Sequence, residues 1–448
     1  MKLNLLILVL TFMAQSTLSQ IVTIPDAIFK STLINEPVVD TDGDEIGDVD
    51  ADTNDDGEIQ VSEALAVGTL VMDFFDIASL EGIEEFQNLS ILICRFAILE
   101  GVDISQNIAL EKIDFTGNEL ITNLDVSINT NLSSIAVGGT SMTSFDLTGL
   151  NDLRILYIDS SDIIDLNLTG CSSLEYFWAV DSVLSDLGTT DCTNLIFLDF
   201  TDGNLVNLDL TNNPNIEFLN LAGNNIPTLD VTLNPRLDTA YLGGSPINEL
   251  DVSQNPLLRI LAINATNITD IDVSNNPELK EFFGNSANLS SVVDLSQNPD
   301  LTSVRVDGNP NITGLNIQNG NNEILFSMLA VSTPNLMCVQ VDDIAFAKSQ
   351  PNWQIDTDDE YSLDCGFLGL TDSSQSNLLI LYPNPSSDFI YISSQTSIDK
   401  VDIYTMSGQQ IPTIFNSESI DVSAMSAGVY FIEITSEETK QVLKFIKE

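Results

Sequence analysis

Apolar residues recur along the chain with a step of 21 or 22 residues. Within each step they occupy offsets 0, 3 and 5, as in Leu195, Leu198 and Phe200. Offsets 3 and 5 share a parity, so this stretch predicts a short β-strand with one buried face. A second phrase, L-D-[VL]-[ST]-x-N-P, lies between successive strands and returns at the same step. Its second residue falls at Asp103, Asp125, Asp146, Asn167, Gly188, Asp209, Asp230, Asp251, Asp272, Asp294 and Asn316.

This fixed step over eleven copies predicts a solenoid, in which a turn buries its apolar face only against its neighbours. From about Leu70 to Asn322 the pattern L-x-x-L-x-L-x-x-N resembles the leucine-rich repeat family in its 21-residue class. The resemblance implies an α/β-type leucine-rich repeat solenoid over residues 70–335, dominated by β-strands that form one parallel sheet. At about 4.8 Å per strand, eleven turns would extend roughly 50 Å.

The asparagine of the repeated phrase is the polar position for which we expect an inward orientation. Its side-chain amide would satisfy backbone groups of adjacent turns that are otherwise buried without partners. Three turns hold Leu150, Cys171 or Cys192 at this position, and each of these side chains fits an inward slot. The asparagines are Asn107, Asn129, Asn213, Asn234, Asn255, Asn276 and Asn298.

Both ends of the repeat array are expected to carry caps, because a solenoid must cover its exposed core. Residues 20–69 are acidic and helix-prone and form the predicted N-terminal cap. Residues 336–366 lose the repeat after one more strand (Leu336, Val339 and Val341) and form the C-terminal cap. A linker follows over residues 367–377. Residues 378–448 contain short alternating strands separated by turn residues, which predict a small antiparallel β-sandwich.

Residues 1–19 predict a secretory signal peptide. They contain one lysine, an apolar stretch from Leu3 to Met13 and small residues before Gln20. The apolar stretch is too short to cross a bilayer, and no later run reaches the roughly 18 apolar residues of a transmembrane helix. We therefore expect an exported protein without a membrane-spanning segment.

The landmarks of residues 378–448 resemble the type A C-terminal sorting domain of the type IX secretion system of Bacteroidota. The resemblance implies export across the outer membrane by a dedicated translocon, after which the tail is removed and the protein is released or attached at the cell surface. The secretion machinery is therefore an expected partner. The matching segments are Tyr382-Pro383-Asn384-Pro385, the strand Ile403-Tyr404 ending at Gly408, Gly428-Val429-Tyr430-Phe431, and Lys444-Phe445-Ile446-Lys447.

The charged and titratable residues limit which partners the protein can bind and which reactions it can catalyse. The chain has 66 acidic and 14 basic residues, no histidine and a formal net charge of −52. This charge repels nucleic acids, which we exclude as partners. The lack of histidine excludes Ser-His and Cys-His nucleophile systems and zinc sites built on imidazole. A carboxylate pair as in glycosidases remains open, but no two acids stand out, so we expect no enzyme.

The N-terminal acidic segment predicts calcium as a cofactor. Residues 52–63 match the twelve-residue calcium loop at every constrained position, with Gly57 at the sharp turn. The expected ligands are Asp52, Asn54, Asp56, the carbonyl of Glu58, and Glu63. The preceding acids resemble the tandem calcium loops of thrombospondin type 3 repeats and dockerins. The alternative is a solvated acidic stretch without a cation. These preceding acids are Asp40, Asp42, Asp44, Asp48 and Asp50.

The five cysteines have three predicted roles. In an exported protein, Cys338 and Cys365 flank the C-terminal cap and are expected to form a disulfide. Cys171 and Cys192 occupy the same slot in adjacent turns; a bond between them is open, but parallel side chains about 5 Å apart favour buried thiols. Cys94 falls at an inward offset and is expected to fill the core.

Offsets 2, 4 and 6 of each strand are expected to face the concave surface, where solenoids commonly bind partners. Five consecutive turns place aromatic side chains there. Exposed rings on a rigid sheet suit sugars or apolar side chains, and the alternative is a ladder of rings that only stabilises the sheet. The predicted ligand-binding residues are Tyr157, Tyr176, Trp178, Phe197, Phe218 and Tyr241.

These features predict a secreted or cell-surface recognition protein that binds a glycan, peptide or protein on its concave face. The alternative is a calcium-dependent structural or adhesive surface component without a soluble ligand. The two classes differ in one property: the recognition protein retains a soluble ligand as a monomer, whereas the structural component associates with itself in calcium.

Overall fold

The computed structural model describes residues 20–366 and, in the tail, residues 380–382, 386, 389–393, 398, 400–405, 409–411, 419–426, 428–436 and 439–447. The predicted signal peptide and linker lie outside the described residues. The chain divides into two compact units, Met1–Phe367 and Leu368–Glu448, and each is described by itself.

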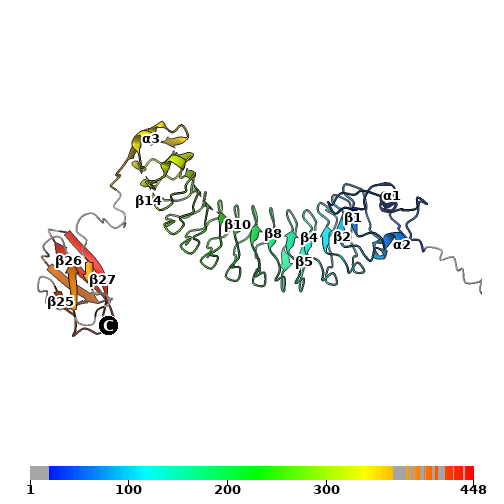
Figure 1. Cartoon of the computed structure of the whole chain (residues 1–448), viewed down its shortest axis with the longest axis horizontal. Coiled ribbons are helices and arrows are strands. Elements are labelled where there is room, and N and C mark those ends of the chain that lie inside the picture. The colour runs from blue at the N-terminus through cyan, green and yellow to red at the C-terminus, as the bar shows by residue number, and fades with distance from the viewer. Residues whose placement is uncertain are drawn as a thin grey trace, which may run out of the picture. The chain divides into compact units, whose positions relative to one another are not determined.

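The first unit is a leucine-rich repeat solenoid, as predicted, and its turns stack one after another (Figure 1). Its main sheet has fourteen parallel strands, one per turn. Eleven turns carry the repeated phrase, and the sheet is longer because β1, β17 and β19 join it without that phrase. The strands are β1 (Thr69–Val71), β2 (Ile91–Ile93), β3 (Lys112–Asp114), β4 (Ser134–Ala136), β6 (Ile155–Tyr157), β8 (Tyr176–Trp178), β9 (Phe197–Asp199), β10 (Phe218–Asn220), β11 (Thr239–Tyr241), β12 (Ile260–Ala262), β13 (Glu281–Phe283), β15 (Ser303–Arg305), β17 (Ser327–Ala330) and β19 (Trp353–Ile355).

In the main sheet, strands β1 to β15 bury their central residue, and most of them leave the two flanking residues partly exposed. In β9, Leu198 is fully buried, and Phe197 and Asp199 on either side are partly exposed. Leu198 lies in register with Phe177 of β8, which is also fully buried. This confirms the strand predicted from offsets 3 and 5. The buried side chains of successive turns form one continuous core from Val22 to Trp353.

The asparagines of the repeated phrase point inward and bond to the preceding turn, as predicted. Asn255 Nδ2 donates to the carbonyl oxygens of Val231 and Asn234, both at 2.9 Å. Asn234 in turn donates to Leu210 and to Asn213 of its own preceding turn, at 3.1 and 2.8 Å. The same pair of bonds is made by Asn107, Asn129, Asn213, Asn276 and Asn298.

The cysteines also confirm their predicted roles. Cys94, Cys171 and Cys192 are free and fully buried. Burial raises the pKa of Cys94 and of Cys192 to about 12, which keeps both thiols protonated at neutral pH. Cys171 and Cys192 fill asparagine slots, and the Cys171 thiol lies 3.3 Å from the carbonyl oxygen of Leu147.

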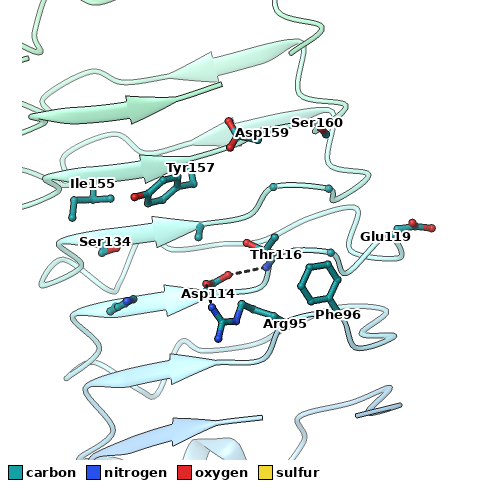
Figure 2. Close-up of a pocket in the computed structure, with 15 residues that line it drawn as sticks. Arg95, Phe96, Asp114, Thr116, Glu119, Ser134, Ile155, Tyr157, Asp159 and Ser160 are labelled. Carbon is teal, nitrogen blue, oxygen red and sulfur yellow. Dashed lines mark hydrogen bonds and ion pairs between the residues drawn. The ribbon is translucent and has the colours of Figure 1, made fainter. Parts of the chain in front are cut away.

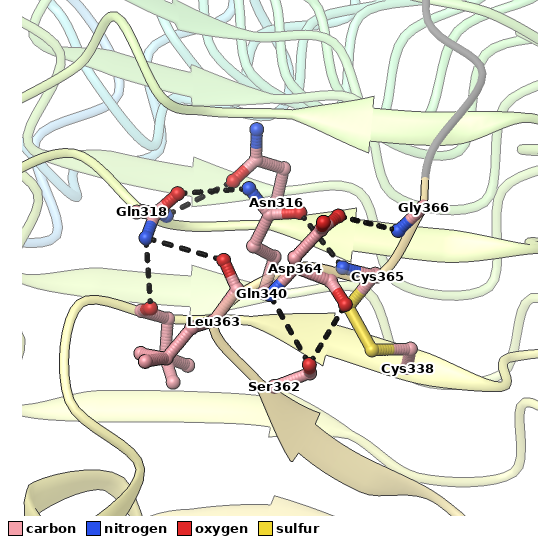
Figure 3. Close-up of a disulfide and its surroundings, with 10 residues drawn as sticks. Asn316, Gln318, Cys338, Gln340, Ser362, Leu363, Asp364, Cys365 and Gly366 are labelled. Carbon is pink, nitrogen blue, oxygen red and sulfur yellow. Dashed lines mark hydrogen bonds between the residues drawn. A yellow bond between two sulfur atoms is a disulfide. The ribbon is translucent and has the colours of Figure 1, made fainter.

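Short strands on the returning side of the turns form two small parallel sheets. The C-terminal one ends next to the predicted disulfide between Cys338 and Cys365, whose Cα atoms are 5.8 Å apart (Figure 3). Gln340 supports this corner, because its amide donates to Gln318 at 2.8 Å and its oxygen accepts from the Cys365 N–H at 3.2 Å. The two sheets are β5 (Ser144–Asp146) with β7 (Asp165–Asn167), and β14 (Val292–Asp294), β16 (Gly314–Asn316), β18 (Cys338–Gln340) and β20 (Glu360–Ser362).

Short helices and one buried tryptophan close the ends of the solenoid. The N-terminal cap holds α1 (Ala27–Asn35) and α2 (Val61–Ala64), followed by the 3-10 helix η1 (Ile83–Glu85). Asp26 caps α1 and also accepts from the N–H groups of Ala78 and Ser79, which ties the helix to the first turn. At the other end, η2 (Asn322–Ile324) and α3 (Ile344–Ser349) accompany Trp353, which is 6% exposed and donates to the Leu325 carbonyl at 2.9 Å.

The second unit contains small antiparallel sheets with a core of their own, as predicted. That core includes Ile390, Ile403, Ile432 and Phe445. No helix in the described part of the whole chain is both long and apolar enough to cross a bilayer. The sheets are β21 (Ile380–Tyr382), β22 (Phe389–Ser393) and β25 (Ser419–Asp421), and β24 (Gln410–Ile411), β23 (Lys400–Thr405), β26 (Gly428–Ser436) and β27 (Thr439–Lys447).

The asparagine ladder generates the first prediction. Asn255→Ala leaves two buried carbonyl oxygens without a donor, so it should lower the free energy of unfolding by about 2 kcal/mol. Urea denaturation followed by circular dichroism measures this change. The matched control is Gln254→Ala, because Gln254 is the exposed neighbour and, among the described residues, its amide donates only to the Ser253 hydroxyl. Equal midpoints for the two variants would contradict a stabilising role for the ladder.

Candidate binding site on the concave face

The six predicted aromatic residues lie on five neighbouring strands, β6 to β11, and form one continuous row. We call the solvent-facing side of the fourteen-stranded sheet the concave face, and these residues the aromatic row. Tyr157 and Trp178 are in register and stack with their ring centroids 4.3 Å apart and an interplanar angle of 13°. Tyr176 lies two residues before Trp178, with its ring centroid 6.1 Å away.

The row continues diagonally toward the C-terminal turns. Trp178 and Phe197 have ring centroids 4.6 Å apart, and Phe197 stacks on Phe218 at 4.3 Å with an angle of 4°. Phe218 meets Tyr241 at 5.9 Å and 60°. All six side chains are partly exposed. The rings therefore support one another and still present one side to solvent, which leaves binding by this row a prediction.

A hollow of about 760 Å³ lies beside the N-terminal end of the row (Figure 2). Its floor is made by small residues at and after β4, namely Ser134, Ala136 and Gly138. Because these side chains are short, the larger residues on the neighbouring strands rise around them as walls. The sequence shows small residues here but gives no sign that they make a cavity. The walls include Arg95, Phe96, Lys112, Asp114, Ile155, Tyr157 and Asp159.

The two basic residues of the hollow already have acidic partners. Arg95 Nε donates to Asp73 Oδ1 at 2.9 Å, and this bond is the main reason why the pKa of Arg95 is raised. Lys112 Nζ lies 2.6 Å from a carboxylate oxygen of Glu45, which comes from the N-terminal acidic segment. The positive charges at the rim are therefore largely neutralised within the protein.

Asp159 is a carboxylate of the hollow that lacks such a partner among the described residues. Its Oδ1 accepts from the backbone N–H of Val180 at 2.8 Å. Burial raises the pKa of Asp159, and the nearby charges of Asp199 and Asp181 raise that pKa further. In the described part of the chain, no lysine or arginine forms an ion pair with Asp159. A cation brought into the hollow would therefore relieve an unfavourable charge.

In the first acidic loop of the N-terminal cap, oxygen atoms of Asp40, Asp42 and Asp48 lie within 4.8 Å of one another. Asp40 is 7% exposed and accepts from the backbone N–H groups of Asp42, Gly43 and Glu45, at 3.0, 2.7 and 2.9 Å. The hydrogen bond from Gly43 is the main cause of the lowered pKa of Asp40. An all-oxygen set of this kind fits a hard divalent cation. Asp44 faces its own turn, where it accepts from the Ile46 N–H at 2.9 Å.

The side chains of the second loop, residues 52–63, are held by bonds within the loop. Both carboxylate oxygens of Asp56 accept from the Gln60 amide at 3.0 Å, and Glu63 accepts from the Gln60 backbone N–H at 2.9 Å. Asp52 accepts from Gly57 at 2.7 Å. Among the described residues, the one group of three acidic side chains with oxygen atoms within 4.8 Å of one another is Asp40, Asp42 and Asp48. No residue of the loop 52–63 belongs to that group. The amide of Asn54 donates to Gln60, and Glu58 pairs with Lys30.

Comparison with known proteins identifies the tail. Residues 380–448 match the family of secretion system C-terminal sorting domains, so the chain carries a sorting domain. No curated protein sequence matches the chain.

Several solved structures resemble the chain at low sequence identity. The functional domain of InlJ from Listeria monocytogenes, described as including a cysteine ladder, is 18% identical, with 87% of this chain and 93% of that chain covered and a TM-score of 0.48. An internalin (inlF) from Listeria monocytogenes str. 4b F2365 is 19% identical, with coverages of 76% and 98% and a TM-score of 0.48. YopM from Yersinia enterocolitica is 18% identical, with coverages of 60% and 64% and a TM-score of 0.43.

Proposed function

We propose that this is an exported recognition protein that binds a peptide, protein or glycan on its concave face. The observation that carries the proposal is the aromatic row, in which six partly exposed rings lie side by side on neighbouring strands. Ring faces held on a rigid sheet bind sugars or apolar side chains with little loss of conformational entropy. The adjoining hollow adds polar groups that can fix the orientation of a ligand.

The sorting domain supports export as part of the proposal. Together with the predicted signal peptide, it favours transport by the type IX secretion system and a final location outside the cell or on its surface. The secretion machinery would then be the partner of the tail, and the solenoid would act after the tail is removed. We propose binding without catalysis, because the chain has no histidine to activate a nucleophile.

We also propose that calcium binds the N-terminal cap, with Asp40, Asp42 and Asp48 as the favoured site. Three carboxylates this close repel one another unless a cation offsets their charge. Glu45 lies within the same loop and pairs with Lys112 of the hollow. A cation that orders the loop would therefore also steady one wall of the binding site. This link to the cap supports the alternative of a calcium-dependent surface component as well.

Trp178→Ala tests the aromatic row. If the row binds ligand, loss of this central ring should weaken binding by about 2 kcal/mol, roughly thirtyfold, and leave the melting temperature nearly unchanged. A glycan and peptide array probed with the full chain gives the ligand, and titration calorimetry gives the affinities. Phe326→Ala is the control, since Phe326 is 74% exposed and outside the row. A lowered melting temperature with unchanged affinity would instead assign the row a structural role.

Calcium should raise the stability of the first unit. At about 100 times the dissociation constant, a ligand that binds only the folded state adds about 2.7 kcal/mol. Differential scanning calorimetry in calcium and in chelator measures this gain, and magnesium serves as the comparison ion. Asp40→Asn with Asp48→Asn should abolish the gain, whereas Asp52→Ala with Glu63→Ala should keep it. Identical melting curves with and without calcium would exclude the proposal, and the reverse pattern of variants would move the site to residues 52–63.

The tail should be dispensable for folding of the solenoid and necessary for export. A chain ending at Gly366 retains the whole core from Val22 to Trp353, so its main melting transition should match that of the full chain. Expressed in a host with a type IX system, it should stay in the periplasm, where fractionation and immunoblotting detect it. Arrival of the shortened chain at the cell surface would show that the tail is not the export signal.

A further inference from the structure

Two phenylalanines occupy a backbone position that disfavours large side chains. In every turn from β1 to β17, one residue shortly after the strand has a positive φ. Phe74 (φ 63°) and Phe96 (φ 52°) hold this position in the first two turns. A bulky residue in the left-handed region is strained, so the fold gives no reason to choose phenylalanine here. The later turns use Gly117, Gly139, Ser160, Asp181, Asp202, Gly223, Gly244, Ala265, Ser286, Gly308 and Ser332.

The two rings are exposed and stack on each other. Phe74 is 74% exposed and Phe96 is 51% exposed, with ring centroids 4.9 Å apart and an interplanar angle of 6°. The Phe96 ring lies over Gly117, where an added Cβ atom would approach Phe96 Cδ1 to 2.4 Å. Gly117 thus leaves room for a ring that contributes little to the core. An exposed apolar pair that is held at the expense of backbone strain indicates a contact with a partner.

The phenylalanine pair borders the hollow, because Phe96 forms one of its walls (Figure 2). Tyr157 and Asp159 line the same hollow from β6 and its following turn. Asp114 ends β3 and also lines the hollow. Its carboxylate accepts from the Thr116 N–H at 3.0 Å and lies 3.8 Å from the Arg95 guanidinium. The apolar phenylalanine pair therefore adjoins a hollow that has an unpaired carboxylate, Asp159, among the described residues and whose two basic residues, Arg95 and Lys112, are already paired.

We propose that this surface docks a peptide segment with an apolar side chain against Phe74 and Phe96 and a lysine or arginine side chain in the hollow, between Tyr157 and Asp159. The proposal rests on the proposed function and names its ligand class. A guanidinium or ammonium group can lie over the Tyr157 ring and donate charge-assisted hydrogen bonds to Asp159. An anionic ligand fits poorly, because Arg95 and Lys112 are already paired and the chain carries a net charge of −52.

Selection of random twelve-residue peptides tests this proposal. The full chain is immobilised, and the retained peptides are compared with those retained by Asp159→Asn and by Phe96→Ser. Both variants should fold, because asparagine keeps the acceptor for the Val180 N–H and serine occupies the left-handed position in other turns. Peptides retained by the unchanged chain should combine a basic and an apolar residue. Their affinity, measured by fluorescence polarisation, should fall about tenfold or more in either variant and stay unchanged in Phe326→Ser.

Three results would overturn the proposal: no difference in retention between the unchanged chain and the variants, selected peptides without a basic residue, or equal binding after the peptide's arginine is replaced by citrulline. The variant Trp178→Ala distinguishes failure of the peptide proposal from failure of the proposed function. If array ligands depend on Trp178 but not on Asp159 or Phe96, the concave face binds ligands and the peptide assignment is wrong. If none of the three variants changes binding of any ligand, both proposals are wrong.

Discussion

The need to satisfy buried backbone groups between turns determines the rest of this structure. Carbonyl groups at the bend of each turn face the core, as those of Val231 and Asn234 do. The asparagine amide supplies two donors to them, and both acceptors of Asn255 belong to the preceding turn. Asn298, which follows Asn276 by 22 residues, makes the same pair of bonds as Asn255, which follows Asn234 by 21, but a larger change in repeat length would misplace the amide. The ladder therefore keeps the repeat at 21 or 22 residues. That constancy places equivalent side chains in columns, and one such alignment is the aromatic row.

The sequence predicts the repetitive part of the fold because the positions at which apolar residues recur are the positions that are buried. The offsets of Leu195, Leu198 and Phe200, the inward asparagines and the pairing of Cys338 with Cys365 are all confirmed. The count of eleven turns omits β1, β17 and β19, because these strands lack the repeated phrase, although Leu70 and β17 lie within the predicted range 70–335; each of them pairs with a neighbouring strand of the sheet. Boundary strands of this kind depend on their neighbours more than on their own residues.

The binding surface is less accessible to sequence reasoning, because it arises from differences between turns. The hollow exists because Ala136 lies between larger residues of the adjacent strands, which becomes visible only when the turns are superposed. Phe74 and Phe96 could have been found in that way, as phenylalanines in a column of glycine, serine, aspartate and alanine. In the acidic segment, the residue types of positions 52–63 match a calcium loop. Only the structure shows that the Gln60 side-chain amide donates to both carboxylate oxygens of Asp56.

The bonds between turns also bear on how such a surface can change during evolution. Asn234, Asn255 and Asn276 each bond to the turn immediately before them, and no cap takes part in these bonds. An in-frame duplication of one turn would recreate the interfaces on both of its sides. Inserted at β4 it would widen the hollow by about one strand spacing, 4.8 Å, and inserted at β9 it would lengthen the aromatic row by the same amount. The footprint of the concave face can therefore be resized in whole strand steps by gene duplication, before any side chain is altered.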